Sequence, residues 1–280
     1  MGKVIVVANQ KGGVGKTTTA VNLTTALAAA GRSVLLIDMD PQANASTGLG
    51  VSKHQRVFNT YHLLIGECTL GQVLIRTSIP GLSIIPSSID LLGAEIELVN
   101  LENRSSILKE ILAPYTNMFD YILIDCPPSM GLLTLNAMVA ADSVLVPLQC
   151  EYYALEGLSY LLNSIHKIRR THNPKLSLFG VVLTMFDKRS SLSNMVARDV
   201  RQYLGDKVFN TEIPRNSKVS EAPSHGKPVL IYDIKCVGSQ GYMSLAREII
   251  QKEIVSRETF SENDTIRDES NHKTLKAGVI

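Results

Sequence analysis

One short segment near the amino terminus restricts the possible folds of this chain more than any other. An apolar run at residues 4–8 leads into the glycine-rich sequence Asn-Gln-Lys-Gly-Gly-Val-Gly-Lys-Thr-Thr-Thr at residues 9–19, and a helix-forming sequence follows. Glycines let backbone N–H groups turn toward one point, and the dipole of a following helix favours an anion there. A strand, a glycine-rich loop and a helix in this order predict a polyphosphate site in an α/β fold.

The loop departs from the usual phosphate-loop pattern. That pattern has a glycine five positions before Gly15, where this chain has Gln10 and then a second lysine, Lys11. Lys16 can reach the β- and γ-phosphates, and the hydroxyl of Thr17 can ligate Mg²⁺. A chance glycine turn before a helix is the alternative, and Gly-Lys-Thr in the loop that follows a strand argues against it. The predicted phosphate-binding residues are Lys11, Gly12, Gly13, Val14, Gly15, Lys16, Thr17 and Thr18.

Short β-branched runs alternate with amphipathic stretches along the rest of the chain. This alternation predicts an α/β fold of the P-loop NTPase type, a mostly parallel twisted sheet with helices on both faces. Strands are predicted at residues 4–8, 34–38, 82–86, 121–125, 143–147 and 179–184, and helices near 16–30, 104–115, 154–170, 192–204 and 241–253. Residues 50–77 are interpreted as a helical excursion between strands.

Acidic residues end two of the predicted strands. Asp38 and Asp40 follow the second strand, at the edge where open α/β sheets bind ligands, and the turn at Pro41 leaves their directions open. Asp38 is a candidate for Mg²⁺ or its water shell, or alternatively for a cap or turn. Asp125 ends the apolar run at residues 121–124, where a carboxylate can hold Mg²⁺ directly or through water. A helix cap is the alternative for Asp125.

The lysine-bearing loop resembles the deviant Walker A motif of the ParA/MinD group of P-loop ATPases. The resemblance continues through Asp-Met-Asp-Pro-Gln at 38–42, Asp-Cys-Pro-Pro at 125–128, Ile-Pro-Arg at 213–215 and Ser-Glu-Ala-Pro-Ser-His-Gly-Lys-Pro at 220–228. These blocks span about residues 2–250 and are most similar to Soj-type ParA proteins.

The resemblance implies Mg²⁺-dependent hydrolysis of the β–γ bond of ATP. It implies that Asp40 orients the attacking water, while Lys16 holds the phosphates of its own subunit. It also implies an ATP-bound homodimer in which Lys11 reaches the partner's phosphates, so that Lys11, Lys16 and Asp40 form the catalytic set. Adenine would lie against Met185 and Pro214, although ordinary core packing explains Met185 equally well.

Charge is distributed unevenly along the chain. The net charge is +2, yet residues 166–218 hold eleven basic and four acidic side chains, which gives +7 there and −5 elsewhere. Such a segment can bind the phosphates of nonspecific DNA, or it can be a set of solvated helix ends pointing in several directions. The resemblance assigns DNA contacts to Arg189 and Lys218, and Lys188 adds a charge beside them. Arg215 is assigned to the nucleotide or to the dimer interface.

Composition supports one folded unit with a tail. The chain is 45% hydrophobic and 19% charged, as ordinary globular proteins are. Residues 1–255 are predicted to form a single P-loop ATPase domain, and the polar residues 256–280 are predicted to be disordered, because they carry little apolar surface. No apolar run approaches the roughly 20 residues of a transmembrane helix, and no cysteine pair forms a CxxC motif, so we expect a cytoplasmic protein.

These features predict one function and leave alternatives. We expect a Mg²⁺-dependent ATPase that forms an ATP-bound dimer on nonspecific double-stranded DNA of the nucleoid and, with a ParB-type centromere-binding partner, segregates chromosome or plasmid DNA. A sibling ATPase that positions another cargo would share these motifs. A MinD-type membrane-cycling regulator needs a C-terminal amphipathic helix, and residues 274–280 offer few bulky apolar side chains, so no membrane contact is expected. A nitrogenase-like iron protein needs cysteine motifs that Cys126 and Cys150 do not match.

Overall fold

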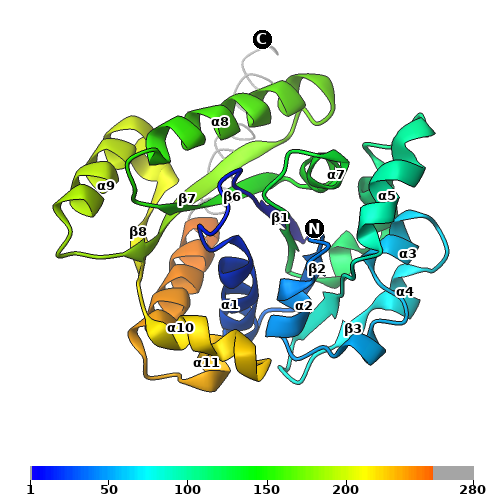
Figure 1. Ribbon diagram of the computed structural model, residues 1–280, viewed down its shortest axis with the longest axis horizontal. Helices are drawn as coiled ribbons and strands as arrows, with labels where there is room; N and C mark the ends of the chain where they lie inside the picture. The colour runs from blue at the N-terminus through cyan, green and yellow to red at the C-terminus, as the bar shows by residue number, and fades with distance from the viewer. Residues whose placement is uncertain (1, 255–280) are drawn as a thin grey trace, which may run out of the picture.

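An eight-stranded sheet runs through the centre of the molecule. The computed structural model describes residues 2–254, and the predicted tail at 256–280 lies outside these described residues. The strand order is β3-β4-β2-β5-β1-β6-β7-β8, and every paired neighbour is parallel except β3 and β4 at one edge. Helices cover both faces of this sheet (Figure 1). The predicted fold class is therefore confirmed.

All six predicted strands are present, and two further strands lie at the edges of the sheet. The strands are β1 (Lys3–Val7), β2 (Val34–Asp38), β3 (Ile75–Arg76), β4 (Leu82–Ile85), β5 (Tyr121–Asp125), β6 (Ser143–Gln149), β7 (Ser177–Phe186) and β8 (Val208–Pro214). The sequence does not predict β8, because Asn210, Thr211 and Glu212 interrupt its apolar pattern. The two residues of β3 are too few to leave a pattern.

Helices connect nearly all the strands. They are α1 (Lys16–Ala29), α2 (Asn44–Gly48), α3 (Thr60–Leu64), α4 (Leu70–Val73), α5 (Leu91–Glu97), α6 (Ile107–Leu112), α7 (Leu132–Ala140), α8 (Ala154–Thr171), α9 (Ser191–Leu204), α10 (Ser217–Glu221) and α11 (Val229–Tyr232). A final helix begins at residue 237 and is described to residue 254. The predicted helix at 104–115 is shorter as an α-helix, because Pro114 starts a 3₁₀ segment (Ala113–Met118) directly after α6. The predicted helical excursion at 50–77 contains α3 and α4 but ends in β3.

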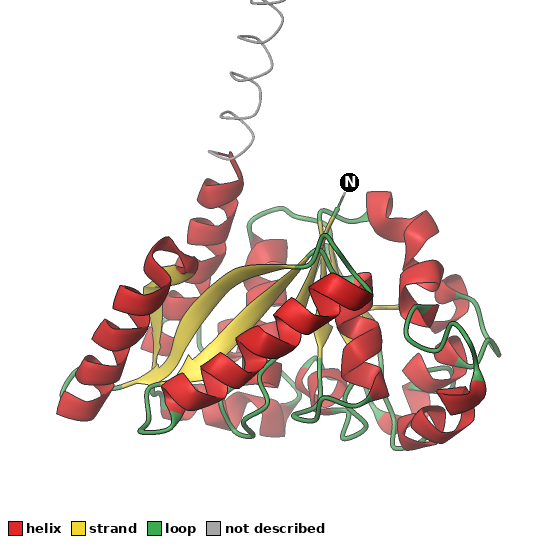
Figure 2. Ribbon diagram, turned by 90° about the horizontal axis from the view of Figure 1, so that it is seen from above, coloured by secondary structure: helices red, strands yellow, loops and turns green. Residues whose placement is uncertain are grey.

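Side chains of each central strand alternate between two buried clusters, one on each face of the sheet. In β1, Val4 and Val6 belong to the cluster under α5 to α9, whereas Ile5 and Val7 belong to the cluster under α1, α11 and the final helix. Figures 1 and 2 show these two helical layers on opposite sides of the sheet. Buried side chains therefore cover both faces of the sheet, and loops lie at its carboxyl edge.

The carboxyl ends of the three central strands are level with one another. Val7 pairs with Asp125 across β1 and β5, and Asp125 pairs with Asp38 across β5 and β2. The phosphate loop starts just after Val7, so the register brings this loop and two predicted acidic residues to one edge.

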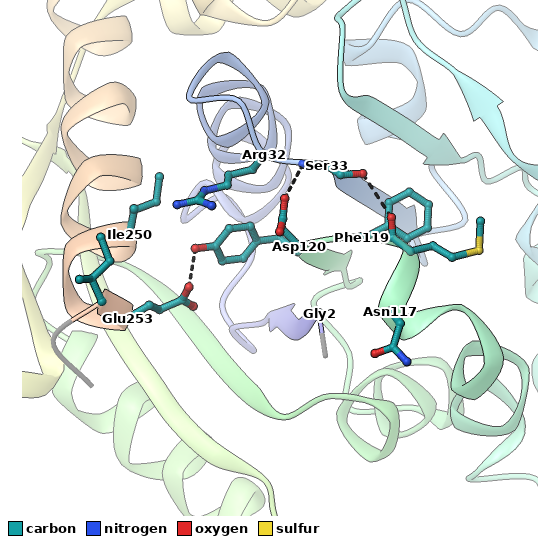
Figure 3. A pocket seen from close by; sticks show the side chains of 11 residues that line it. Gly2, Arg32, Ser33, Asn117, Phe119, Asp120, Ile250 and Glu253 are labelled. Carbon is teal, nitrogen blue, oxygen red and sulfur yellow. Dashed lines mark hydrogen bonds between the residues drawn. The ribbon is translucent and has the colours of Figure 1, made fainter. Parts of the chain in front are cut away.

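The final helix is attached at the opposite, amino-terminal edge of the sheet. The Tyr121 hydroxyl donates to Glu253 at 2.6 Å, and the Lys3 ammonium lies 3.1 Å from the same carboxylate. Tyr121 and Glu253 border a cavity of about 340 Å³, at which the backbone N–H of Ser33 donates to Asp120 (Figure 3). Within residues 2–254, no helix has both the length and the apolar character needed to cross a membrane.

Candidate active site

A cavity of about 590 Å³ opens at the carboxyl edge, between the phosphate loop and the segments that follow β7 and β8. Among the predicted site residues, it is lined by Gly12, Gly13, Gly15, Lys16, Thr17, Thr18, Asp40, Met185, Pro214 and Arg215. Its other lining residues include Gln42, Asn44, Pro128, Thr184, Asn216, Val219, Ser220, Pro223 and Tyr242, which the sequence does not assign to the site. The predicted residues that do not line it are Lys11, Val14, Asp38, Asp125, Lys188, Arg189 and Lys218.

Two glycines give the phosphate loop its shape. Gly13 and Gly15 have φ values of 74° and 87°, in the left-handed region that glycine adopts without strain. No side chain caps α1 at Gly15, so the first N–H groups of the helix remain available to an anion. The Asn9 side chain holds the loop start, because it accepts from the Lys11 N–H at 3.1 Å and donates to the Pro147 carbonyl at 2.8 Å.

The end of β7 braces the loop from the other side. The buried Thr184 hydroxyl donates to the Val14 carbonyl at 2.7 Å. The next residue, Met185, has a φ of 49°, a conformation that is strained for a residue with a side chain and that often marks a functional site. A polar residue at the end of an otherwise apolar strand is the sequence signal that could have identified Thr184.

The Lys16 side chain is inside the loop. It is 7% exposed, and burial lowers the pKa of its ammonium, while the negative charges of Asp125 and Asp40 oppose that change. Its Nζ donates to the Lys11 carbonyl at 3.1 Å, which keeps the ammonium beside the loop backbone. A buried ammonium beside the uncapped start of a helix is suited to a phosphate.

The side chain of the second lysine points elsewhere. Lys11 forms an ion pair with Glu151, which lies just after β6. The two side chains are 39% and 46% exposed, so this pair is at the surface and not inside the cavity.

Asp125 is completely buried, and neither of its carboxylate oxygens has a hydrogen-bond partner among the described residues. Burial holds the pKa of Asp125 well above its usual range, and the neighbouring Asp38 raises it further. The Thr17 side chain and the Lys16 ammonium partly offset this rise. An unpartnered carboxylate beside a hydroxyl is a donor set that fits Mg²⁺, which binds one or two carboxylates together with phosphate oxygens and water.

Asp38 is also completely buried, but its oxygens are occupied. One accepts from the backbone N–H and the hydroxyl of Ser46 at 2.8 and 2.7 Å, and the other accepts from the Asp40 N–H at 3.2 Å. Burial raises the pKa of Asp38 to about 6, although the hydrogen bonds from Ser46 oppose the rise. These contacts favour the turn-forming alternative for Asp38. Asp40 lines the cavity, and its Oδ1 accepts from the Gln42 N–H at 2.9 Å.

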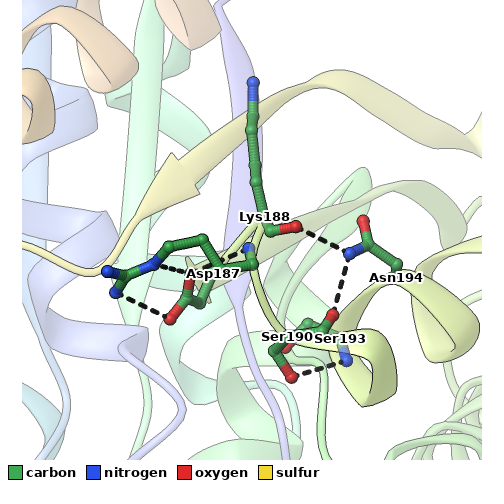
Figure 4. A network of polar contacts seen from close by, with 6 residues as sticks. Asp187, Lys188, Ser190, Ser193 and Asn194 are labelled. Carbon is green, nitrogen blue, oxygen red and sulfur yellow. Dashed lines mark hydrogen bonds and ion pairs between the residues drawn. The ribbon is translucent and has the colours of Figure 1, made fainter.

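The predicted DNA contacts lie in the loop after β7 and in α10 after β8, at the same edge of the sheet, because Phe186 and Pro214 end β7 and β8 in register. Lys188 is exposed, and Figure 4 shows its side chain extending away from the hydrogen bonds that hold the start of α9. The guanidinium of Arg189 pairs with Asp187 at 3.1 Å, and Lys218 pairs with Glu221 at 2.8 Å.

Other basic residues of the same segment serve the fold. Arg201 donates to the Phe209 carbonyl at 3.0 Å and lies 3.2 Å from Glu212. Because Arg201 and Glu212 both belong to residues 166–218, their pairing leaves the net charge of the segment at +7, but it holds Arg201 within the fold.

Comparisons with known proteins agree with this geometry. Residues 2–178 match a family model described as an AAA domain. The chain is 56% identical over 257 residues to the chromosome partitioning protein ParA of Caulobacter vibrioides, which covers 90% of this chain and 95% of that protein. The chain belongs to the ParA/Soj family of partitioning ATPases. The chromosome-partitioning ATPase Soj of Treponema pallidum is 51% identical over 253 residues, 90% of this chain and 99% of that one.

A solved structure is similar over most of the fold. Cobyrinic acid a,c-diamide synthase from Mycobacterium smegmatis, solved with bound ADP and magnesium, matches with a TM-score of 0.77 and 37% identity, covering 88% of this chain and 93% of that one. Membership of the ParA/Soj family confirms the predicted resemblance and the predicted enzyme class, an ATP hydrolase. The roles of individual site residues stay predictions.

Proposed function

We propose that this partitioning ATPase binds Mg²⁺–ATP in the 590 Å³ cavity and uses hydrolysis of the β–γ bond to time its assembly on DNA. One observation carries the proposal. The uncapped start of α1, the buried Lys16 ammonium and the Asp40 carboxylate all border a single cavity. That combination offers anion binding and water positioning in one place, and phosphoryl transfer depends mainly on positioning and charge neutralisation.

The lining residues of this cavity and the buried Asp125, which does not line it, have distinct tasks. The backbone of Gly12, Gly13 and Gly15 and the Lys16 ammonium hold the β- and γ-phosphates, and Thr18 adds a hydroxyl at the helix start. The Thr17 hydroxyl and Asp125 are the residues suited to Mg²⁺, which when bound neutralises charge on the phosphate oxygens.

The carboxylates at and just after the end of β2 position the attacking water. Asp40 orients this water, and Asp38 holds Asp40 in place through its hydrogen bonds to the Asp40 N–H and to Ser46. In this proposal Asp38 is a positioning residue, while a direct metal contact would require it to exchange those bonds.

The nucleotide base occupies the outer part of the cavity. Met185 and Pro214 provide apolar surface for adenine there, and Arg215 borders the same space. The strained backbone of Met185 supports a functional role beyond packing.

Dimerisation brings Lys11 into use. With ATP bound, two copies face each other across the carboxyl edge, and Lys11 leaves Glu151 to reach the partner's phosphates. The exposure of both side chains supports this, because a surface ion pair costs little to open. Hydrolysis is thereby coupled to assembly.

The dimer binds nonspecific double-stranded DNA through Lys188, Arg189 and Lys218, and so associates with the nucleoid. Each copy contributes one set of these residues, and doubling the phosphate contacts raises affinity steeply. A ParB-type partner then stimulates hydrolysis and release, which completes a cycle that segregates DNA.

Steady-state ATPase measurements of Lys16→Ala and Asp40→Ala test this proposal. Both should lose at least about 100-fold in turnover, since each removes a group aimed at the reacting phosphate or water. Glu67→Ala removes an exposed carboxylate that does not line the cavity, and it serves as the matched control. Near-normal turnover in both site variants would refute the mechanism.

A further inference from the structure

Helix α5, the turn before it and the 3₁₀ turn after it expose a stripe of apolar side chains. Ile89, Leu92, Ile96 and Val99 are 64%, 52%, 75% and 48% exposed. Their spacings of three and four residues put them on one face of the helical segment. We call these four residues the α5 stripe.

The opposite face of the same helix is already buried. Leu91, Ala94 and Leu98 belong to the core cluster beneath it. A helix that is apolar on both faces is normally covered on both. Figure 1 shows α5 at the periphery of the molecule, and the exposure of the stripe means that no described element covers its outer face. Exposed apolar patches of this kind mark interaction sites.

The apolar surface continues beyond the stripe into a groove of about 460 Å³. Leu101, two residues after Val99 and 45% exposed, is one wall of the groove. Ile107, Ile111 and Tyr115 of the following helical segment also line it. A partner segment that covers the α5 stripe would therefore lie next to this groove.

The charge beside the α5 stripe is mostly negative, although Arg104 and Lys109 are exposed nearby. Residues 86–103 contain four carboxylates and no lysine or arginine, although the whole chain carries a net charge of +2. Asp90, Glu97 and Glu102 are exposed beside the stripe, and Glu110 lines the groove. The next basic residue, Arg104, donates to the Val99 carbonyl at 2.8 Å.

We propose that the α5 stripe and the adjoining groove dock a basic amphipathic helix of a partner protein. Its apolar side chains would cover the stripe, and its lysines and arginines would face the carboxylates, as in other helix-in-groove complexes. An anionic membrane would meet the carboxylates with like charge. A second copy of this chain in a two-fold contact would bring the same carboxylates together. The inference goes beyond the proposed ATPase cycle and does not depend on it.

Fluorescence anisotropy with a labelled Leu/Lys amphipathic peptide of about 18 residues tests the proposal. The full-length protein should bind it, and Leu92→Ser combined with Ile96→Ser should weaken binding at least about tenfold. Glu97→Gln combined with Glu102→Gln should weaken it several-fold and reduce its salt dependence. Ile231→Ser, at a site on α11 that is 55% exposed, is the matched control and should bind as the wild type does.

Four results would overturn the proposal. One is equal binding of a Leu/Glu peptide with the same apolar face, and a second is unchanged binding by the stripe variant. A third is stripe-dependent sedimentation with anionic phosphatidylglycerol vesicles, which would assign the surface to a membrane. The fourth is loss of ATP-dependent dimerisation in the stripe variant, which would assign it to a second copy. Normal circular dichroism and basal ATPase activity should accompany the variants.

Discussion

Asp38 and Asp125 lie opposite each other on the adjacent parallel strands β2 and β5, and both are completely buried. Asp38 accepts three hydrogen bonds, whereas Asp125 accepts none from the described residues. Their mutual repulsion raises the pKa of Asp125 further above its usual range than burial alone. A cation at this edge of the sheet should therefore interact more strongly with Asp125 than with Asp38.

Replacing Asp125 with asparagine separates a metal-binding role from a structural one. The amide resembles the protonated carboxyl that the raised pKa favours, so the free energy of unfolding without nucleotide should change by less than about 1 kcal/mol. The Mg²⁺ concentration needed for ATP hydrolysis should rise at least about tenfold. Urea unfolding and a magnesium titration of turnover measure the two quantities. Lost stability with an unchanged magnesium response would show that Asp125 is structural.

The raised pKa of Asp38 predicts how stability depends on pH. Its pKa of about 6 in the folded protein lies above the ordinary value of 3.8, so the folded state binds this proton more tightly than the unfolded state does. The free energy of unfolding should therefore rise as pH falls from 7 toward 4, by up to about 3 kcal/mol from this group. Comparing urea unfolding of the wild type with Asp38→Asn isolates the effect, because the variant cannot titrate there. Identical pH slopes in the two proteins would contradict the prediction.

The part of the site that is continuous in sequence could be predicted from the residues themselves, whereas Met185, Pro214 and Arg215 of the outer wall are assigned only through the family resemblance. Gly13, Gly15 and Lys16 signal their role because the loop conformation and the helix start depend on neighbouring residues. The outer wall of the cavity forms because β7 and β8 lie side by side in the sheet. No sequence pattern predicts β8. The bond from Thr184 to Val14 joins residues 170 positions apart and depends on β1, β6 and β7 being neighbours in the sheet.

The sequence predicts Asp38 and Asp125 as site residues but cannot distinguish their environments. Asp38 and Asp125 each end an apolar strand, so their local patterns are alike. The difference between them comes from Ser46, which α2 brings back to Asp38 from eight residues away. Only the folded chain shows that one carboxylate is satisfied and the other is not.

The Thr184 hydroxyl should be required to hold the phosphate loop. Thr184→Val keeps the shape of the side chain but leaves the buried Val14 carbonyl without its donor, which should cost about 1–2 kcal/mol in unfolding free energy. The KM for ATP should rise several-fold more than kcat falls, because loop geometry affects binding first. Thr171→Val removes a hydroxyl bond within α8 and is the control. An unchanged KM in Thr184→Val would mean that the phosphate loop does not need the hydrogen bond from β7.

Releasing Lys11 from Glu151 should favour assembly. Glu151→Gln removes the charge that holds the Lys11 ammonium in its own subunit, so the ATP-dependent dimer should form at several-fold lower protein concentration. Analytical ultracentrifugation with a non-hydrolysable ATP analogue measures this, and Glu156→Gln, an exposed position on α8, is the matched control. Lys11→Ala should lose the dimer. If Lys11→Ala dimerises like the wild type, the lysine does not act across the interface.

The ion pair between Asp187 and Arg189 should regulate DNA affinity. Arg189→Glu replaces a phosphate contact with repulsion and should abolish nonspecific DNA binding while ATP binding persists. Asp187→Asn releases the guanidinium and should strengthen DNA binding several-fold. Arg76→Glu makes the same charge change on edge strand β3 and controls for net charge. Filter binding across a salt series measures all three. If Arg76→Glu and Arg189→Glu weaken binding equally, net charge rather than this loop determines affinity.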